Sequence, residues 1–311
     1  MQLDTVGGVT TAIFRTGALT PAQRAAVNDL VARVAEHDGV TPLNEAALFA
    51  VEGRSPAVHW LAHRGQQLVG YAQADRDNHS VQLFVDADAR REGIAAALVE
   101  QVQLVEKAPT WWAFGNGEGA RAMSDRLGID LARELLIMER DLVAHPVVDE
   151  PTPADLVIRD FQPTDAAALV QANADAFAHH PEQGNMTLQE FELRASEQSF
   201  DPAGLKVAID DDSGAFLGFH WTKIENSDPA NPDEPIGEVY VIGVRPEAAG
   251  RGIGRALLAA GLRHLASKGV SRVRLYVEAS EARVVKMYQS ASFVEITRDA
   301  SYARRGETRE F

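Results

Sequence analysis

Three glycines and two arginines alternate in the segment Gly250-Arg251-Gly252-Ile253-Gly254-Arg255. Glycine lets a backbone approach a ligand closely because it has no Cβ. An Ala/Leu-rich run follows and predicts a helix that begins near Gly252, whose first-turn amides would have no partner within the helix. These amides, the helix dipole and the two arginines together predict a cradle for the pyrophosphate of a nucleotide-like ligand.

Two common phosphate-binding motifs do not fit this segment. A Walker A loop ends in Gly-Lys-Ser/Thr, and no such tripeptide follows here. A Rossmann fingerprint needs an acidic residue at the end of the next strand about 20 residues on, whereas the next strand closes only at Glu278. The remaining alternative is a glycine-rich turn that merely enters a surface helix.

A second copy of this strand, turn and helix lies in the first half of the chain. It reads LFVDADARREGIAAALVEQV and resembles IGVRPEAAGRGIGRALLAAG, with Gly93 lying 159 residues before Gly252. The same offset pairs Val85 with Val244, and it brings Arg91 within one position of Arg251. Two copies of one unit predict a tandem two-domain protein and make the merely structural reading of the glycines less plausible.

Similar elements surround both copies. Strand-like runs at 58–63, 67–75 and 80–86 precede the first loop, and runs at 205–210, 216–224 and 237–244 precede the second. A proline-rich acidic stretch separates the halves. We therefore expect an α/β fold of two tandem domains, each a mixed, mostly antiparallel sheet flanked by helices. Their expected bounds are 1–145 and 156–311, with a linker at 146–155.

Composition limits the function classes. Thirty Lys and Arg stand against 45 Asp and Glu, a net charge of −15 that argues against nucleic acid or an anionic membrane as partner. The chain has no cysteine, which excludes disulfides, thiolate metal sites and cysteine nucleophiles. The adjacent His179 and His180 lack further ligand spacing, so we expect no metal. No secretory signal or apolar run of about 18 residues is visible, so we expect a cytoplasmic protein.

The glycine loops carry a resemblance to the GNAT superfamily of acyl-CoA-dependent N-acyltransferases. The family signature Q/R-x-x-G-x-G/A is met in full by Arg90-x-x-Gly93-x-Ala95, while the second copy departs from it at Ala249. The resemblance implies acetyl-CoA as the acyl donor, bound in both halves. The residues that it implies for acetyl-CoA are Leu83, Phe84, Val85, Arg90, Arg91, Glu92, Gly93, Ile94, Ala95 and Ala96 in the first half, and Ile242, Gly243, Val244, Ala249, Gly250, Arg251, Gly252, Ile253, Gly254, Arg255, Glu281, Ala282, Arg283, Val284, Val285 and Lys286 in the second.

A narrower resemblance covers nearly the whole chain. The segments GEVYVIGV, GFHWTK, HHPEQGN, LYVE and VVKMYQSASF are similar to those of the mycothiol synthases, a family of tandem-GNAT enzymes from actinobacteria. This resemblance implies acetylation of the cysteinyl amine of cysteinyl-glucosaminyl-inositol, the last step of mycothiol biosynthesis. It also implies substrate contacts from Glu45, Glu182, Lys223, Glu238 and Tyr276, with the substrate between the two domains.

Acyl transfer from a thioester to an amine needs a base, a polarised carbonyl and a stabilised leaving thiolate. Glu238, at the start of GEVYVIGV, is the candidate base, as the resemblance also implies. Gly243 interrupts a β-branched strand and predicts a bulge that frees a backbone amide for the carbonyl oxygen. Tyr288 is the candidate acid. Because a phenol has a pKa of about 10 and an alkyl thiol about 8.5, hydrogen bonding should contribute as much as proton donation.

The first half lacks these two groups. Aligned on the glycines, His79 stands in place of Glu238, and aligned on the helix end, Ser124 stands in place of Tyr288. We therefore expect a non-catalytic N-terminal domain and a catalytic C-terminal one.

Two other functions stay open at this stage. The chain could acetylate another small amine, such as an aminoglycoside, or a protein N-terminus. It could also be a non-catalytic, CoA-binding regulatory pair, although the presence of Glu238 and Tyr288 in only one half argues against that. The expected partners are acetyl-CoA and a small-molecule amine, and the expected state is a monomer.

Overall fold

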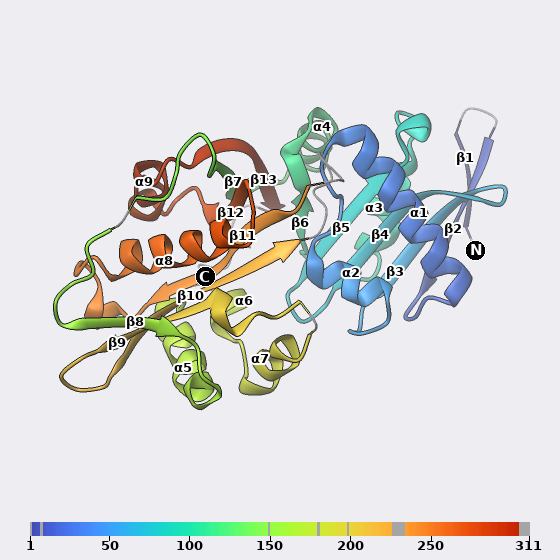
Figure 1. The fold of residues 1–311 in the computed structure, drawn as a ribbon. Helices are drawn as coiled ribbons and strands as arrows, with labels where there is room; N and C mark the ends of the chain where they lie inside the picture. Colours follow the sequence, from blue (N-terminus) through green and yellow to red (C-terminus); the bar gives the residue numbers. More distant parts are fainter. Residues whose placement is uncertain are drawn as a thin grey trace. The chain divides into compact units, whose positions relative to one another are not determined.

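The computed structural model describes residues 2–6, 9–148, 150–178, 181–197, 199–225 and 234–304. The chain forms two compact units (Figure 1). Unit 1 contains the chain up to Leu135 together with the segment that begins at Thr297, and unit 2 runs from Leu136 to Ile296. No helix within the described ranges is long and apolar enough to cross a membrane.

Unit 1 is a mixed sheet in the order β1-β2-β3-β4-β5-β6-β13. Its neighbouring strands pair antiparallel, except β5 and β6, which pair parallel. Its strands are β1 (Gln2–Val6), β2 (Val9–Thr16), β3 (Val58–Arg64), β4 (Gln67–Asp75), β5 (Ser80–Val85), β6 (Thr110–Ala113) and the C-terminal part of β13 (Val294–Ala303). Its helices are α1 (Pro21–Asp38), α2 (Glu45–Val51), α3 (Ile94–Gln103) and α4 (Glu118–Leu127), with short 3-10 turns η1 (Ala87–Ala89) and η2 (Phe114–Asn116).

Local sequence explains where the helices of unit 1 begin. Thr20 caps α1 by accepting a hydrogen bond from the Gln23 amide at 3.3 Å, and the Gln23 side chain accepts from the Thr20 amide at 2.9 Å. Pro21 stands at the first helical position, where its missing N–H costs nothing. Val27, Leu30 and Val34 then bury one face of α1 in the core.

Unit 2 repeats the architecture with the sheet order β7-β12-β11-β10-β9-β8. Its strands are β7 (Asp130–Asp141, from Leu136 onward), β8 (Leu156–Asp160), β9 (Leu205–Asp210), β10 (Phe216–Glu225), β11 (Ile236–Val244) and β12 (Arg272–Glu278). Its helices are α5 (Ala166–Ala176), α6 (Pro181–Gly184), α7 (Leu188–Ala195), α8 (Ile253–Ser267) and α9 (Ala282–Ser290), with 3-10 turns η3 (Pro163–Asp165), η4 (Pro202–Gly204) and η5 (Pro246–Ala248).

Helices cover both faces of the unit 2 sheet (Figure 1). On one face Phe219 and Trp221 of β10 pack with Phe191 of α7 and Leu169 of α5. On the other face the buried side of α8 packs on the sheet, and Tyr288 of α9 lies in the same apolar cluster as three leucines of α8. The sheet therefore separates two layers of side chains, and β10 and β11 contribute to both.

The expected fold class of two mixed, mostly antiparallel α/β units is confirmed. The last strand adds a feature that was not expected from the order of elements. Residues 300–302 of β13 pair with residues 111–113 of β6, so the C-terminal strand completes unit 1 rather than unit 2. Unit 2 instead takes the second half of β7, where the Leu142 amide donates to the Ser271 carbonyl at 2.8 Å.

Candidate active site

The parallel strands β11 and β12 are joined only at their beginning. Their register comprises Ile236 with Arg272, Gly237 with Val273 and Glu238 with Arg274. Along the rest of both strands, all of whose residues are described, β11 and β12 have no residue pair. The β11 edge beyond Glu238 therefore offers backbone amides and carbonyls to an extended ligand, as strand edges do.

A bulge bends β11 just after Glu238. Trp221 of β10 is opposite Val241, but the next residue, Thr222, is opposite Val239, so Tyr240 is the extra residue. The prediction of a bulge at Gly243 is wrong, because Gly243 pairs regularly with Phe219.

Gly243 has a steric reason instead. A Cβ at this position would lie 3.1 Å from the Phe219 ring, 3.2 Å from Ala176 and 3.3 Å from the Phe177 ring. The glycine thus lets α5 pack closely on the sheet, and the strand irregularity arises elsewhere.

Glu238 lies where the strands separate. It is half-buried, and its register partners are Lys223 on β10 and Arg274 on β12. The Lys223 Nζ atom lies 3.4 Å from the centre of the Tyr240 ring, a cation–π contact that fixes this flexible side chain. Arg274 donates to Glu139 at 3.0 Å. A carboxylate flanked by two basic residues thus stands at the narrow end of the opening.

The wide end of the opening meets the N-terminus of α8. Gly250 and Gly252 have φ angles of 86° and 85°, a region that side chains other than glycine rarely adopt. No side chain caps the helix at Gly252, and a Cβ built there would meet no atom within 4 Å. The first bond of the helix joins the Ala256 amide to the Gly252 carbonyl at 3.1 Å. Space and first-turn amides are therefore available for an anion.

The arginines of the loop are placed differently from one another. Arg251 binds Asp155 at 2.5 Å and Asp210 at 3.4 Å, and these two carboxylates raise the pKa of its guanidinium. Arg255 is exposed on the first turn of α8. Arg283 of α9 lies close to the loop, since a Cβ at Gly250 would be 3.8 Å from its Nη2 atom. The cradle residues Ala249, Ile253, Gly254, Glu281, Ala282, Val284, Val285 and Lys286 belong to this turn and to α8 and α9 or their starts.

Tyr288 is buried on α9 among apolar residues. Its ring packs edge-on against Phe293 at 5.7 Å, and it shares a cluster with Val239, Leu275 and Val277 of the two separating strands. Burial raises the pKa of the Tyr288 phenol well above its ordinary value. Within the described chain no hydrogen bond to its hydroxyl is found, so the group is available to a ligand.

Unit 1 contains the same loop geometry. Gly93 has φ 85° and ψ −2°, nearly the 85° and 0° of Gly252. Arg91, with φ 62°, occupies the backbone position of Gly250, as the offset of 159 residues requires. The parallel pair β5–β6 is likewise joined only through Ser80, Val81 and Gln82, which leaves Leu83, Phe84 and Val85 on an unpaired edge.

Side chains around this first loop are engaged with each other. Arg90 donates two hydrogen bonds to Asp38, at 2.9 and 2.7 Å, and one to the Val85 carbonyl at 3.1 Å. Glu92 forms an ion pair with Arg64. The remaining predicted contacts Ile94, Ala95 and Ala96 form the first turn of α3.

The structure refines the internal comparison between units. Because β5 pairs with β4 without a bulge, Ser80 and not His79 is the counterpart of Glu238. Ser124 of unit 1 is the positional counterpart of Tyr288 of unit 2, as the alignment on the helix end predicts. The turn after each helix has a left-handed residue, Gly128 or Ser292, and an amide of the next residue bonded to the carbonyl of Ser124 or Tyr288.

The predicted substrate residues are dispersed. Lys223 stands beside Glu238 in register, and Tyr276 is 46% exposed on β12, two residues after Arg274. Glu45 is exposed at the first position of α2 in unit 1. The side chain of Glu182 and the residues His179 and His180 lie outside what the structure describes. No group of three or more potential metal ligands occurs among the described residues.

Sequence reasoning missed Tyr240 and Arg274. A signal for the bulge exists, because Val239, Tyr240, Val241 and Ile242 are four successive apolar residues in a strand that otherwise alternates. Such a run also fits a strand buried on both faces, so the sequence alone does not locate the extra residue.

Known proteins match both units. The Acetyltransferase (GNAT) family model matches residues 168–293, and an Acetyltransferase (GNAT) domain model matches residues 42–107. The mycothiol acetyltransferase of Propionibacterium freudenreichii subsp. shermanii is 45% identical over 278 residues, which is 89% of this chain and 87% of the relative. That of Mycolicibacterium smegmatis is 40% identical over 95% of this chain and 99% of the relative. The chain belongs to the mycothiol acetyltransferase family.

Solved structures agree with this family at the level of the fold. A GCN5-related N-acetyltransferase from Sphaerobacter thermophilus superposes with a TM-score of 0.71 at 23% identity over 94% of this chain and 95% of that one. A tandem GNAT protein from the clavulanic acid biosynthesis pathway gives 0.69 at 17% identity over 94% and 98%. The family models and the curated relatives, together with this fold, confirm the expected GNAT acetyltransferase, an enzyme class that implies acetyl-CoA as the donor.

Proposed function

We propose that this mycothiol acetyltransferase family member transfers the acetyl group of acetyl-CoA to the cysteinyl amine of cysteinyl-glucosaminyl-inositol, the last step of mycothiol biosynthesis. One observation carries the proposal. The unpaired edge of β11 runs from the anion cradle at Gly252 to the carboxylate of Glu238. A pantetheine chain laid along that edge has its phosphates at one end and its thioester at the other.

The chemistry at the thioester follows from three groups. The amine nitrogen attacks the thioester carbon, and Glu238 takes the proton that the nitrogen loses. A β11 amide near the Tyr240 bulge donates to the oxygen that becomes negative, an interaction worth about 3 kcal/mol in comparable sites. The C–S bond then breaks, and the Tyr288 hydroxyl donates to the leaving sulfur. The products are an amide and coenzyme A.

We assign the acceptor site to Lys223, Tyr276 and Glu238 of unit 2, while Glu45 and Glu182 remain substrate contacts that only the family resemblance implies. A polyhydroxylated amine needs several polar partners, and the first three lie around the opening between β11 and β12. Unit 1, with Ser80 and Ser124 at the corresponding positions, would hold acetyl-CoA without turnover. We take the active protein to be a cytoplasmic monomer.

The test is release of free coenzyme A from acetyl-CoA with a panel of amines. Rapid release with the cysteinyl pseudodisaccharide is expected, and Glu238→Gln should lower kcat about 10²–10⁴-fold at neutral pH. The control Glu100→Gln changes an exposed carboxylate on α3 and should leave kcat intact. Release only with aminoglycosides or peptide N-termini would replace the acceptor. No release with any amine would favour a binding protein.

A further inference from the structure

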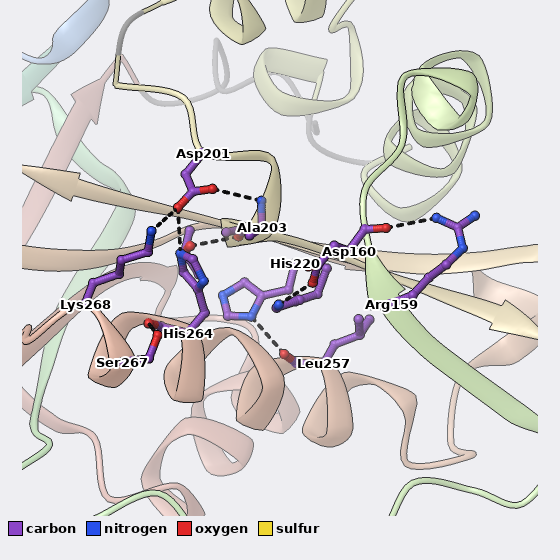
Figure 2. Close-up of polar contacts among 12 residues, drawn as sticks. Arg159, Asp160, Asp201, Ala203, His220, Leu257, His264, Ser267 and Lys268 are labelled. Atoms are coloured by element: carbon purple, nitrogen blue, oxygen red, sulfur yellow. Dashed lines mark hydrogen bonds and ion pairs between the residues drawn. The ribbon is translucent and has the colours of Figure 1, made fainter.

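His220 is a buried histidine that the proposed chemistry does not use. It lies on β10 within the GFHWTK segment, opposite Ile242 of the unpaired β11 edge, and it is fully buried. Its Nδ1 atom is 2.9 Å from the carbonyl oxygen of Leu257, on the second turn of α8 (Figure 2). A carbonyl oxygen can only accept, so Nδ1 carries the hydrogen and donates it.

The other ring nitrogen of His220 has no partner in the part of the chain that the structure describes. Nε2 is buried and unbonded among the described residues. Burial, with smaller contributions from the charges of Lys206 and His264, lowers the pKa of His220 to about 4, so the ring is neutral near pH 7. An unsatisfied buried acceptor is destabilising, because it has lost its hydrogen bonds to water without gaining others. The sequence therefore retains a histidine where it lowers stability.

Helix α8 has a glycine where the His220 ring contacts it. A Cβ at Gly261 of α8 would lie 2.2 Å from both Cε1 and Nδ1 of His220, so only glycine fits. Glycine in the interior of a helix is also less favourable than alanine. The buried His220 and the helix residue Gly261 each lower stability, and together they permit one hydrogen bond between β10 and α8.

Unit 1 has the same fold without a histidine and a glycine at these two positions. In the register of β4 and β10, Ala72 corresponds to His220, and one turn of α3 places Leu98 and Val102 where unit 2 has Leu257 and Gly261. All three unit 1 residues are fully buried and apolar. The polar arrangement accompanies the unit that has Glu238 and Tyr288.

The bonded carbonyl is connected to the anion cradle through the helix. In an α-helix the amide of Leu258, in the same peptide as the Leu257 carbonyl, donates to the carbonyl of Gly254. The peptide of Gly254 ends in the Arg255 amide, one of the first-turn donors without a helical partner. A donor at Leu257 therefore polarises the row of peptides that ends at the cradle, since chained hydrogen bonds strengthen each other.

We propose that His220 is a positioning residue for acetyl-CoA, which holds the first two turns of α8 on β10 so that the cradle amides meet the pyrophosphate. The inference rests on the proposed function, because it concerns the donor site of that reaction. His220 therefore affects the binding of acetyl-CoA and not the acetyl transfer step.

The test compares three forms of the full-length chain. His220→Asn keeps a side-chain N–H near the place of Nδ1 and should bind acetyl-CoA within about twofold of the parent protein, since it preserves the bond. His220→Leu removes the donor. The double change His220→Ala with Gly261→Ala removes the ring and adds only a Cβ, which would lie 3.0 Å from the Thr222 methyl, a contact that this side chain can relieve by a small shift, so the variant should fold. The last two forms should raise the KM for acetyl-CoA about 5–10-fold, or about 1–1.4 kcal/mol, with kcat and the KM for the amine unchanged.

Two further measurements separate positioning from packing. The ring ¹⁵N shifts of His220 should show a protonated Nδ1 and a bare Nε2. Thr222→Val is the matched control, because Thr222 is buried on the same face of β10 but donates to the Gly204 carbonyl at 2.7 Å and not to α8. It should lower stability and leave the KM unchanged.

A folded double variant with the parent KM for acetyl-CoA would overturn the proposal, as would an Nε2-protonated ring. If the parent protein itself fails to bind acetyl-CoA, the proposed function is what fails.

Discussion

Tyr288 combines burial with an unbonded hydroxyl, and this pairing determines how it can act. Because its phenol pKa is raised, it remains protonated through the alkaline range in which an exposed tyrosine begins to ionise. We expect Tyr288→Phe to lower kcat about 10²-fold with little change in either KM, and the parent kcat to show no decline from phenol ionisation below pH 10. Steady-state thiol release between pH 6 and 10 measures both. Tyr302→Phe, which removes a hydroxyl bonded to Asn116 in unit 1, should behave like the parent protein. A Tyr288→Phe variant with the parent kcat would remove this residue from the mechanism.

Arg251 and Arg255 look equivalent in the sequence but not in the structure. Arg251 is occupied by Asp155 and Asp210, while Arg255 is exposed on the first turn of α8. We expect Arg255→Gln to weaken coenzyme A binding several-fold, with the largest loss at low salt, because a charge contact to phosphate is screened by ions. Arg251→Gln should change the affinity by less than about twofold and have little effect on stability, as expected for a solvent-screened surface ion pair. Calorimetric titration at two salt concentrations distinguishes them, and equal losses for both variants would contradict this reading.

At the scale of elements, the bulge distinguishes β11 from its counterpart β5. Deleting Tyr240 removes the extra residue of β11, so that the strand can pair with β10 without a bulge. Glu238 and Val239 then keep their present partners on β10 and their side chains stay on the same faces of the sheet. The regular ladder of β5 in unit 1 shows that a bulge-free strand suits the fold. We therefore expect the deletion variant to fold and bind coenzyme A at α8 but to lose at least about 10²-fold in kcat, since the amide near the carbonyl oxygen is repositioned. A deletion variant with the parent kcat would show that the bulge does not serve catalysis.

Asp299 gives β13 a pH-dependent attachment within unit 1. Its carboxylate is buried and accepts a hydrogen bond from the Gly115 amide at 2.7 Å. Burial raises the pKa of Asp299 to about 6, and the Gly115 bond only partly opposes this. A pKa raised in the folded state means that the stabilising contribution is complete below about pH 4 and is lost as the pH rises through 6. Asp299→Asn keeps an acceptor for Gly115 without the charge. It should raise the free energy of unfolding of unit 1 by about 3 kcal/mol at pH 8 and change it little at pH 4. Melting curves at both pH values test this, and an equal effect at the two would refute it.

The elements that sequence predicts correctly are those whose signals are local. Thr20 and Pro21 mark the start of α1, and the glycines at 93 and 252 mark two equivalent helix starts. The position of the bulge depends on which β10 residue faces which β11 residue, and a run of four apolar residues does not encode that register. In the sequence His220 stands only as part of the family-like segment GFHWTK, because its partner Leu257 is 37 residues away and the need for glycine at 261 arises only from the contact with the His220 ring. The constant offset of 159 residues likewise gives the wrong counterpart for Glu238, His79 in place of Ser80, because β11 contains one more residue than β5.

At the scale of the whole molecule, the return of β13 to unit 1 decides whether the two halves can be separated. A fragment of residues 1–145 contains the loop at Gly93 but lacks Ala300 and Tyr302, which pack with Ile129 and complete the edge at β6. That edge and its apolar residues would then face water, an arrangement prone to aggregation. We expect the fragment to show no cooperative urea transition. The same fragment extended by a flexible linker and residues 294–304 should regain one, and Ala300→Pro within the extension should abolish it because proline cannot donate to the strand ladder. Cooperative unfolding of the bare fragment would show that unit 1 ends where the linker begins. An inactive bare fragment therefore does not establish that unit 1 lacks turnover, and that question is properly addressed with Glu238→Gln in the intact chain, where unit 1 retains its last strand.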